Sequence, residues 1–533
     1  MRLSPSFMAL ALSSGSLLLA IFLFEFYKQY ISNDDKPSRL TTTTTFTTTN
    51  HHHHRDTHLR HILKSAKAER HLARNGFIQL GSQIDGPAQL SGLGFSIDMN
   101  GDGSIIAVGS TTFHVVFEFS GSDWVQKGSV IQCAQDLTST GINTVAISSN
   151  GRFLVTACAV DDQAGVDAGM VGVWEYDDTN NDWSNRQVFL GESPGDQLGY
   201  SVAISDDGVF LVIGASNAYD GLGEVYVYGY NFWPNMTNQY APFQNLTDNY
   251  LRDSTGNETA TSDIESFGNS VALSNNGRRL IVGAPGDDSS VAFNIGQAFV
   301  FELTTDVTGS SYYILISRPL EAEGVADQFG FAVATNGDGS IYAIGAPLNS
   351  GSTTTLTGHV RVYRRGMPGE DEALIKIGSD IDGTAQGDFF GSSVALSADG
   401  LTLVVGAWLA NRVPIDANLT LSGGLAKMYH FDGTDWQSVE FNRTRRDELG
   451  GFPEFFAFGW DVEISHSGDR IVVGSPLNFQ NATFVGVGRA STAGATSSFF
   501  GAIWQQVQGE WNAAWDFMTA LFADDDDIES EVP

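Results

Sequence analysis

The chain has 533 residues, and 28 Lys and Arg against 62 Asp and Glu give it a formal net charge of −34. The phosphate backbone repels so acidic a chain, so we expect no nucleic-acid partner. A hydrophobic share of 42% excludes disorder throughout, and 59 glycines against 14 prolines are typical of an all-β protein with many tight turns.

The first 30 residues predict a hydrophobic membrane-entry segment. Only Ser13, Ser14, Gly15 and Ser16 interrupt the apolar run over residues 7–24, which is about the minimum length for a spanning helix. The sequence leaves two interpretations, an uncleaved signal-anchor helix or a cleaved signal peptide. We expect membrane contact through residues 7–24, and a remainder that is extracellular or lumenal if anchored, or secreted if cleaved.

Residues 31–75 predict a stalk. Residues 1–75 hold ten basic and five acidic residues, a balance of +5, whereas residues 76–533 hold 18 and 57, a balance of −39. A Thr-rich stretch at 41–49 precedes His51–His54 and a basic segment with apolar residues at helical spacing. The histidines suggest either metal binding or the solvated face of a stalk helix, and the helix explains more of the pattern.

One pattern then recurs: an aromatic residue or Leu, Gly, a strand, a Gly turn, a second strand and a Gly-small pair. A degraded copy surrounds Val145-Ala146-Ile147. The other copies begin at Leu93-Gly94, Leu198-Gly199, Phe267-Gly268, Phe329-Gly330, Phe390-Gly391 and Phe458-Gly459. Each unit has room for four strands, so the repeats predict a seven-bladed β-propeller of four-stranded blades over residues 76–510.

Ring closure is also predicted. Leu80-Gly81-Ser82 resembles Ile377-Gly378-Ser379, which follows a fourth strand, so we expect residues 77–84 to complete the seventh blade. We expect the third strand of that blade at 501–504. Residues 511–533 predict an amphipathic segment and an acidic tail.

The Phe-Gly starts and Gly-Ala-Pro ends, complete at Phe267-Gly268 with Gly283-Ala284-Pro285 and at Phe329-Gly330 with Gly345-Ala346-Pro347, resemble the FG-GAP repeats of integrin α-subunit propellers. The resemblance covers roughly residues 77–511. It implies a propeller and leaves the function open, because FG-GAP proteins include adhesion receptors, carbohydrate-associated proteins and a lipase class.

Integrin-like repeats often carry calcium in an acidic loop between strands one and two, which implies a candidate site at Asp98, Asn100 and Asp102. Ser104-Ile105-Ile106 stand where the later acidic ligand belongs. An ordinary hairpin turn also explains this segment, and the sequence favours the turn over a calcium site. Calcium is the only cofactor that the sequence suggests.

No enzyme signature is evident, and we expect a non-enzymatic protein. Four histidines, His114, His359, His430 and His466, are scattered over the repeats without ligand spacing. Acidic pairs such as Asp161-Asp162 leave a carboxylate-dependent hydrolase as an alternative.

Six sequons fall outside the first and second strands of the repeats, which favours a glycosylated, extracellular or lumenal propeller. They are at Asn235, Asn245, Asn257, Asn418, Asn442 and Asn481. Cys133 follows a fourth strand and Cys158 ends the next second strand, so both lie on one face of adjacent blades. That placement is compatible with a disulfide and with two buried thiols, and we expect the disulfide.

That face also carries the long connections between strands two and three, at 159–170, 286–295, 348–357, 409–423 and 477–499. Loops on a rigid scaffold are common binding surfaces. We therefore expect an adhesion or recognition protein that binds a protein or carbohydrate ligand there. The alternatives are a secreted hydrolase and an acidic, cation-binding matrix protein.

Overall fold

The computed structural model describes the repeat region. The described residues are 78–82, 84, 92–133, 143–230, 239–247, 265–286, 295–324, 326–350, 356–366, 370, 373–410, 412–414, 420–439, 457–476 and 484–489. All of them belong to the compact unit Lys67–Pro533. The predicted signal-anchor, the stalk and the segment 511–533 lie outside them. Within the described ranges, no helix is long and apolar enough to cross a membrane.

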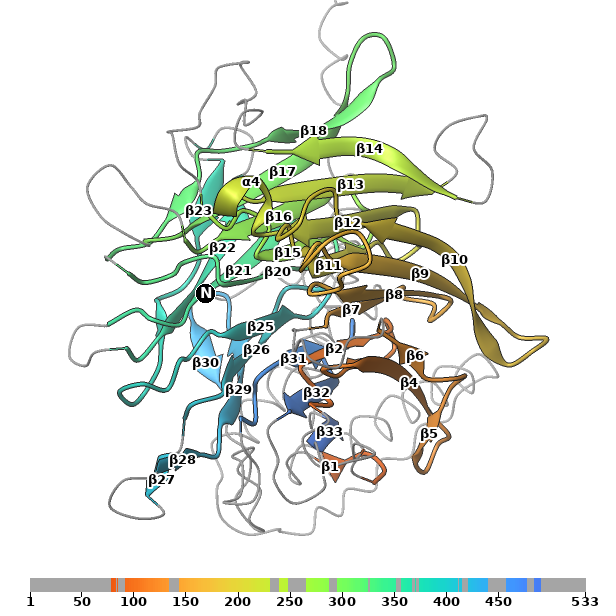
Figure 1. Cartoon of the computed structure of the whole chain (residues 1–533). Coiled ribbons are helices and arrows are strands. Elements are labelled where there is room, and N and C mark those ends of the chain that lie inside the picture. The colour runs from red at the N-terminus through yellow and green to blue at the C-terminus, as the bar shows by residue number, and fades with distance from the viewer. Residues whose placement is uncertain are drawn as a thin grey trace, which may run out of the picture. The chain divides into compact units, whose positions relative to one another are not determined.

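Antiparallel sheets dominate this region, and six of them are each built from one continuous stretch of chain (Figure 1). Sheet 1 contains β2 (Ser96–Met99), β3 (Ile105–Gly109), β4 (Phe113–Phe119) and β5 (Trp124–Gln126), with β6 (Ile131–Gln132) beside β4. Sheet 2 contains β7 (Val145–Ile147), β8 (Phe153–Cys158), β9 (Met170–Asp177) and β10 (Asp182–Leu190). Sheet 3 contains β11 (Leu198–Ile204), β12 (Phe210–Ala215), β13 (Glu224–Tyr230) and β14 (Tyr240–Leu246), with the single turn α4 (Ala218–Gly221) between β12 and β13.

The next three sheets repeat the order. Sheet 4 contains β15 (Ser270–Leu273), β16 (Arg279–Ala284), β17 (Gln297–Thr305) and β18 (Ser311–Leu315), with β19 (Leu320–Glu321) beside β17. Sheet 5 contains β20 (Ala332–Thr335), β21 (Ile341–Ala346), β22 (His359–Arg365) and β23 (Leu374–Lys376), with β24 (Ile381–Asp382) beside β22. Sheet 6 contains β25 (Ser393–Leu396), β26 (Thr402–Ala407), β29 (Leu425–Phe431) and β30 (Trp436–Ser438), and a separate pair, β27 (Arg412–Pro414) and β28 (Thr420–Ser422), lies in its long connection.

A further sheet, the composite sheet, joins the two ends of the described region. Its order is β1 (Ile78–Gln79), β33 (Phe484–Arg489), β32 (Arg470–Ser475) and β31 (Val462–Ile464). Ile78 pairs with Arg489 and Gln79 with Gly488, so the N-terminal strand is outermost, as predicted. The expected third strand at 501–504 was wrong, because β33 already occupies that place beside β32. Instead of seven continuous blades, the structure has six, and the composite sheet stands where the seventh was expected.

The first strands surround a common axis. They lie side by side in the order β2, β7, β11, β15, β20, β25 and β31, and β31 lies beside β2 (Figure 1). At one end of the axis, backbone hydrogen bonds connect the turns between first and second strands in a series from Asp206 round to Ser149, and we call these turns the turn ring. The links are Gly101 N–H to Ser149 O, Asp206 to Asn275, Asn275 to Gly337, Gly337 to Ala398, Ala398 to His466 and His466 to Gly101, all 2.9–3.0 Å. The chain is therefore an all-β propeller whose composite sheet takes part in the ring.

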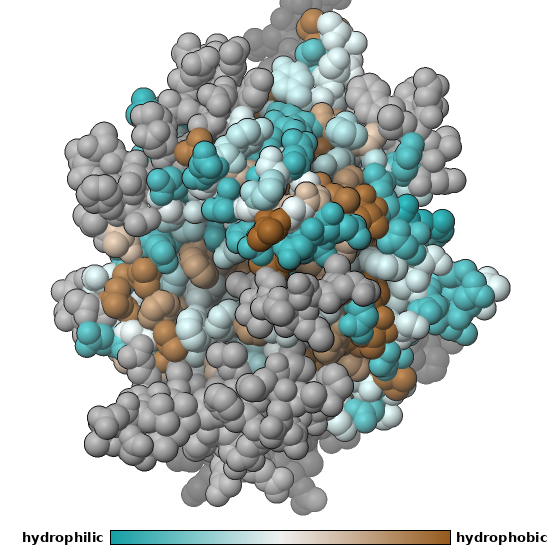
Figure 2. Space-filling view, in the orientation of Figure 1, coloured by the Kyte–Doolittle hydropathy of each residue, from teal (hydrophilic) through white to brown (hydrophobic). Residues whose placement is uncertain are grey.

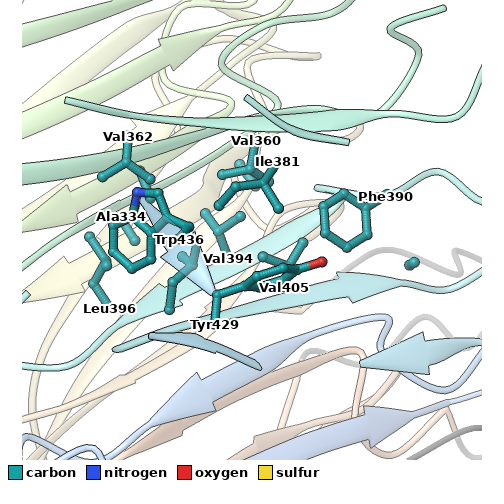
Figure 3. Packing of buried hydrophobic residues seen from close by; sticks show 14 of the residues in the cluster. Ala334, Val360, Val362, Ile381, Phe390, Val394, Leu396, Val405, Tyr429 and Trp436 are labelled. Carbon is teal, nitrogen blue, oxygen red and sulfur yellow. The ribbon is translucent and has the colours of Figure 1, made fainter. Parts of the chain in front are cut away.

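The core lies between neighbouring sheets. Second strands such as β12, β16 and β26 are buried along their whole length because both faces of each sheet pack on neighbours. Figure 3 shows this packing between sheets 5 and 6, where Val360 and Ile381 face Phe390, Val394 and Val405. The opening glycine of the repeat is required for steric reasons. Gly330, for example, has φ +89°, and a Cβ there would lie 2.2 Å from the carbonyl oxygen of Gln297 in the neighbouring sheet.

An outer hydrogen-bonded contact recurs between sheets. Trp436 Nε1 of sheet 6 donates to Ile377 O of sheet 5 at 3.2 Å, and Ser379 N donates to Asp435. The composite sheet meets sheet 1 in the same way: Trp124 Nε1 donates to Leu80 O at 2.8 Å, and Ser82 N donates to Asp123. The likeness of 80–82 to 377–379 therefore reflects an equivalent contact.

Candidate functional site

Four aromatic side chains form a row at the end of the axis opposite the turn ring. Phe389 and Trp408 flank β25 and β26 of sheet 6, Trp460 precedes β31 and Phe95 precedes β2. Ring centroids are 5.8 Å apart for Phe389 and Trp408, 4.8 Å for Trp408 and Trp460, and 5.1 Å for Trp460 and Phe95. All four are half-buried. We call these residues the aromatic row, which crosses sheet 6, the composite sheet and sheet 1.

The local sequence explains why the row is here. Trp408 follows Gly406-Ala407 and so takes the place that Pro285 and Pro347 hold in the complete repeats. Trp460 and Phe95 directly follow the opening glycines of their repeats. Each therefore sits at a fixed strand end, where a half-exposed aromatic ring can contact a ligand at little cost in conformational entropy.

Exposed apolar residues lie on the same face of the propeller. Val166, Tyr219 and Leu356 are 68%, 59% and 40% exposed, and each lies in a connection between strands two and three. Figure 2 shows apolar residues in separate groups among hydrophilic ones on the side of the molecule seen there. The face predicted to recognise ligands thus carries exposed apolar side chains from several sheets.

Three carboxylates lie on or next to the first strands β2 and β31, and we call Asp98, Asp461 and Glu463 the acidic trio. Asp461 accepts hydrogen bonds from Ile97 N at 2.8 Å and from Ser393 Oγ at 2.9 Å, so it joins sheets 1 and 6 to the composite sheet. Asp98 accepts from Ile147 N of sheet 2 at 2.6 Å, and Glu463 accepts from Ile464 N at 2.9 Å. Asp461 and Asp98 thus connect the inner strands of neighbouring sheets, whereas the hydrogen bond of Glu463 stays within its own strand.

Burial dominates the electrostatics of the trio. It raises the pKa of Asp98 to about 7, helped by the charges of Asp461 and Asp206, although two main-chain hydrogen bonds oppose it. Burial also raises the pKa of Asp461 to about 6. The pKa of Glu463 lies well above its usual value, because of burial first and the charge of Asp98 second.

A pair of side chains spans the turn ring. His466 Nε2 of the composite sheet lies 3.5 Å from Asp206 Oδ1 of sheet 3, although these turns are not neighbours in the ring. Burial raises the pKa of Asp206, and His466 opposes that shift. The two ends of the axis therefore differ: one has the aromatic row and the other has this pair.

The calcium candidates have local hydrogen-bonding roles. Asn100 Oδ1 accepts from Ile105 N and Asp102 Oδ1 from Ser104 N, each at 2.8 Å. Asn336 and Asp338 make the same contacts in sheet 5. These contacts are those of an ordinary hairpin turn, and calcium binding at Asp98, Asn100 and Asp102 stays a prediction.

Of the six sequons, only Asn245 lies in a described range; it is exposed, on β14. Asn235, Asn257, Asn418, Asn442 and Asn481 lie outside those ranges, and glycosylation stays a prediction. Cys133 and Cys158 form a disulfide with a Cα–Cα distance of 5.9 Å, which joins sheets 1 and 2.

Another charged group joins sheets 4 and 5. Glu323, His359 and Asp380 place possible ligand atoms within 4.8 Å of one another. The Arg361 guanidinium contacts both carboxylates, and Lys376 Nζ lies 2.8 Å from Asp380. Cationic side chains already neutralise this cluster, so it is an ion-pair network between blades.

Sequence reasoning did not single out the aromatic row or the whole acidic trio. The signal was available in the repeats. At the position of Asp98 and Glu463, the other five copies have Ala146, Ala203, Ala272, Ala334 and Ala395. A residue that breaks a repeat at one aligned position marks a place where packing alone does not choose the side chain.

Three stretches of the chain match a protein-family model. The model described as FG-GAP repeat matches residues 191–228, 256–301 and 381–420. These matches cover parts of sheets 3, 4 and 6. No curated protein is similar enough in sequence to count as a relative. The chain therefore carries FG-GAP repeats at three sites, within a β-propeller arrangement of sheets.

Proposed function

We propose that this chain is a non-catalytic recognition protein that binds a protein or carbohydrate ligand through the face of the aromatic row. The observation that carries the proposal is the row itself. Three centroid distances between 4.8 and 5.8 Å connect half-buried rings from three sheets. Aromatic faces stack on sugar rings and also anchor protein interfaces, where Trp and Tyr are enriched.

The proposal includes a seven-bladed ring in which the composite sheet is the seventh blade. The contact of Trp124 with Leu80 supports it, because Trp436 and Ile377 make the same contact between two continuous blades. A closed ring holds the row at fixed spacing, which lowers the ordering cost of binding.

We further propose an extracellular or lumenal location, with residues 1–30 as signal-anchor or cleaved signal. The Cys133–Cys158 disulfide supports an oxidising compartment, and the exposed Asn245 in a sequon is compatible with it. Expression in a secretory system followed by glycosidase digestion tests this: a mass decrease is expected, and an unchanged mass contradicts it.

The binding proposal is tested with glycan and extracellular-protein arrays probed with the wild-type chain and with the double variant Trp408→Ala/Trp460→Ala. We expect a ligand whose affinity for the double variant falls by roughly 100-fold, because truncated aromatic anchors cost about 2 kcal/mol or more. The matched control is Tyr312→Ala, an aromatic residue 39% exposed on β18 of sheet 4. Equal loss in the control contradicts the assignment to the row.

A carboxylate-dependent hydrolase is the second candidate, and the raised pKa values of the acidic trio favour it. Main-chain N–H groups bind each of the three carboxylates, which fits a structural role better. Turnover of chromogenic glycosides or esters that is lost in Glu463→Gln would establish the hydrolase; no turnover above blank by the wild-type chain removes it.

A further inference from the structure

The imidazole of His114 lies beside the Cys133–Cys158 disulfide and is a third possible metal ligand there. His114 on β4, Cys133 after β6 and Cys158 at the end of β8 place one ligand atom each within 4.8 Å of one another. His114 is 1% exposed and Cys158 is 4% exposed, whereas Cys133 is half-buried. The buried imidazole therefore lies directly beside the disulfide.

The hydrogen bonds of His114 fix its orientation. Its Nε2 lies 3.2 Å from Ala157 O, an acceptor, so Nε2 carries the ring proton and donates it. Nδ1 then carries a lone pair and lies 3.8 Å from Cys133 Sγ. A disulfide sulfur has no proton to donate, so this lone pair receives no hydrogen bond from it.

The protonation state also suits a ligand. Burial lowers the pKa of His114 to about 4, although the carbonyls of Ala157 and Ile131 oppose the shift. The imidazole is therefore neutral at neutral pH, which is the form that binds a metal. An N–H held by a carbonyl is also the usual support for a metal-bound histidine.

We propose that the reduced protein binds a zinc-class divalent cation through Cys133, Cys158 and Nδ1 of His114, so that disulfide and metal site are alternative states of one locus. A dithiol reductant transfers two electrons and two protons to the S–S bond, giving two thiols and the disulfide of the reductant. Metal binding then releases the two thiol protons to solvent, and the imidazole contributes its Nδ1 lone pair.

The geometry fits a tetrahedral ion. With Zn–S of about 2.3 Å and Zn–N of about 2.0 Å, neighbouring ligand atoms lie roughly 3.5–3.8 Å apart. The shorter value applies to nitrogen and sulfur, and the observed Nδ1–Sγ distance of 3.8 Å lies within a few tenths of an ångström of it. Two thiol sulfurs at van der Waals contact are separated by about the same distance, so opening the bridge produces the spacing of the site. Water is the proposed fourth ligand, as at zinc sites with three protein ligands.

The test uses the full chain, reduced with a water-soluble phosphine under nitrogen and titrated with Co²⁺. The readout is the thiolate-to-cobalt charge-transfer band, because Co²⁺ held only by the seven histidines in residues 51–71 would not give that band. We expect one equivalent of Co²⁺ with this band in the reduced chain, none in the oxidised chain, and displacement by Zn²⁺.

Three variants locate the site. Cys133→Ser should abolish the band, and His114→Gln should weaken Co²⁺ binding roughly 100-fold. His359→Gln, a matched buried histidine, should leave it unchanged. No band in the reduced wild-type chain overturns the proposal, as does an equal band in His114→Gln. If reduction unfolds the chain, Co²⁺ must restore the β-sheet circular dichroism; a band without that recovery also overturns it.

Discussion

Sheet 6, the composite sheet and sheet 1 together form what we call the closing junction. The junction and sheets 2 to 5 are built from the same repeat but carry different side chains at equivalent positions. At the aligned position on the first strand, sheets 2 to 6 have Ala, which only packs. Sheet 1 and the composite sheet have Asp98 and Glu463 there, and the aromatic row crosses the same sheets and sheet 6. Sheets 2 to 5 therefore carry the residues that the propeller scaffold requires, whereas the closing junction also carries carboxylates and a row of aromatic rings.

We expect these carboxylates to lower stability at neutral pH. A half-buried carboxylate whose pKa is raised favours its neutral form, so ionising it opposes folding. Unfavourable charge next to half-exposed aromatic rings is typical of functional sites, where stability is traded for binding. The comparison therefore supports the proposal that ligand binding occurs at the closing junction, whereas sheets 2 to 5 serve as scaffold.

The largest expected effect comes from removing the strand that closes the composite sheet. A chain that begins at residue 92 lacks β1 and the Leu80 and Ser82 contacts, whereas a chain that begins at residue 76 keeps them. We expect the shorter chain to lose cooperative unfolding and to aggregate, because β33 becomes an open edge. Equal thermal midpoints for the two chains would show that β1 does not close the ring.

The next effect is in the regular sheets. Phe329 is 0% exposed, and Phe329→Ala should lower the free energy of unfolding by about 3–5 kcal/mol. Phe458 opens the composite sheet at 4% exposure, and Phe458→Ala should cost a similar amount if that sheet is a blade like the others. Urea denaturation measures both, and a cost below about 1 kcal/mol for Phe458 alone argues against equivalence.

The acidic trio gives a pH-dependent prediction. The folded-state pKa values of Asp98, about 7, and Asp461, about 6, exceed unfolded values near 4. The folded state then holds more protons between about pH 4 and 7, so stability falls as pH rises through that window. Glu463→Gln, which keeps an acceptor for Ile464 N, should raise stability at pH 7.5 by about 1–2 kcal/mol and change it little at pH 4.5.

Thermal unfolding of the wild-type chain and of Glu463→Gln at several pH values measures this difference. Asp338→Asn, in an exposed turn of sheet 5, is the control and should show no such pH dependence. Destabilisation by Glu463→Gln at pH 7.5 would contradict the charge account.

The smallest effect tests the outer contacts. Trp124→Phe and Trp436→Phe each remove one hydrogen bond between sheets, to Leu80 O and to Ile377 O. Each should lower the free energy of unfolding by about 1 kcal/mol. A much smaller cost for Trp124→Phe would separate the composite sheet from the other blades.

Much of the fold could be predicted from sequence because the repeat reports it several times. The Phe-Gly start needs a buried ring and a positive-φ glycine, as at Phe329 and Gly330, and both are visible in one sequence. The third strand at 484–489 was missed because that repeat departs from the pattern after Ser475. Its partner β1 lies about 400 residues away, and the likeness of residues 80–82 to 377–379 predicted that β1 closes the sheet but not which strand it pairs with.

The candidate site was harder to predict. Trp408, Trp460 and Phe95 are far apart in sequence, and only the ring brings their strand ends together. Asp98 was named as a calcium ligand, but its contact with Ile147 N depends on how sheets 1 and 2 pack. The distances between side chains of neighbouring blades depend on how the blades pack, and this packing cannot be read from a single sequence.

Hydrogen exchange with and without a ligand from the binding screen tests the central claim most directly. If the junction is the recognition site, bound ligand should protect amides at 92–96, 407–410 and 457–461 and leave those of sheets 2 to 5 unchanged. Protection confined to the turn ring around Asp206 and His466, or to sheets 2 to 5, would contradict the account.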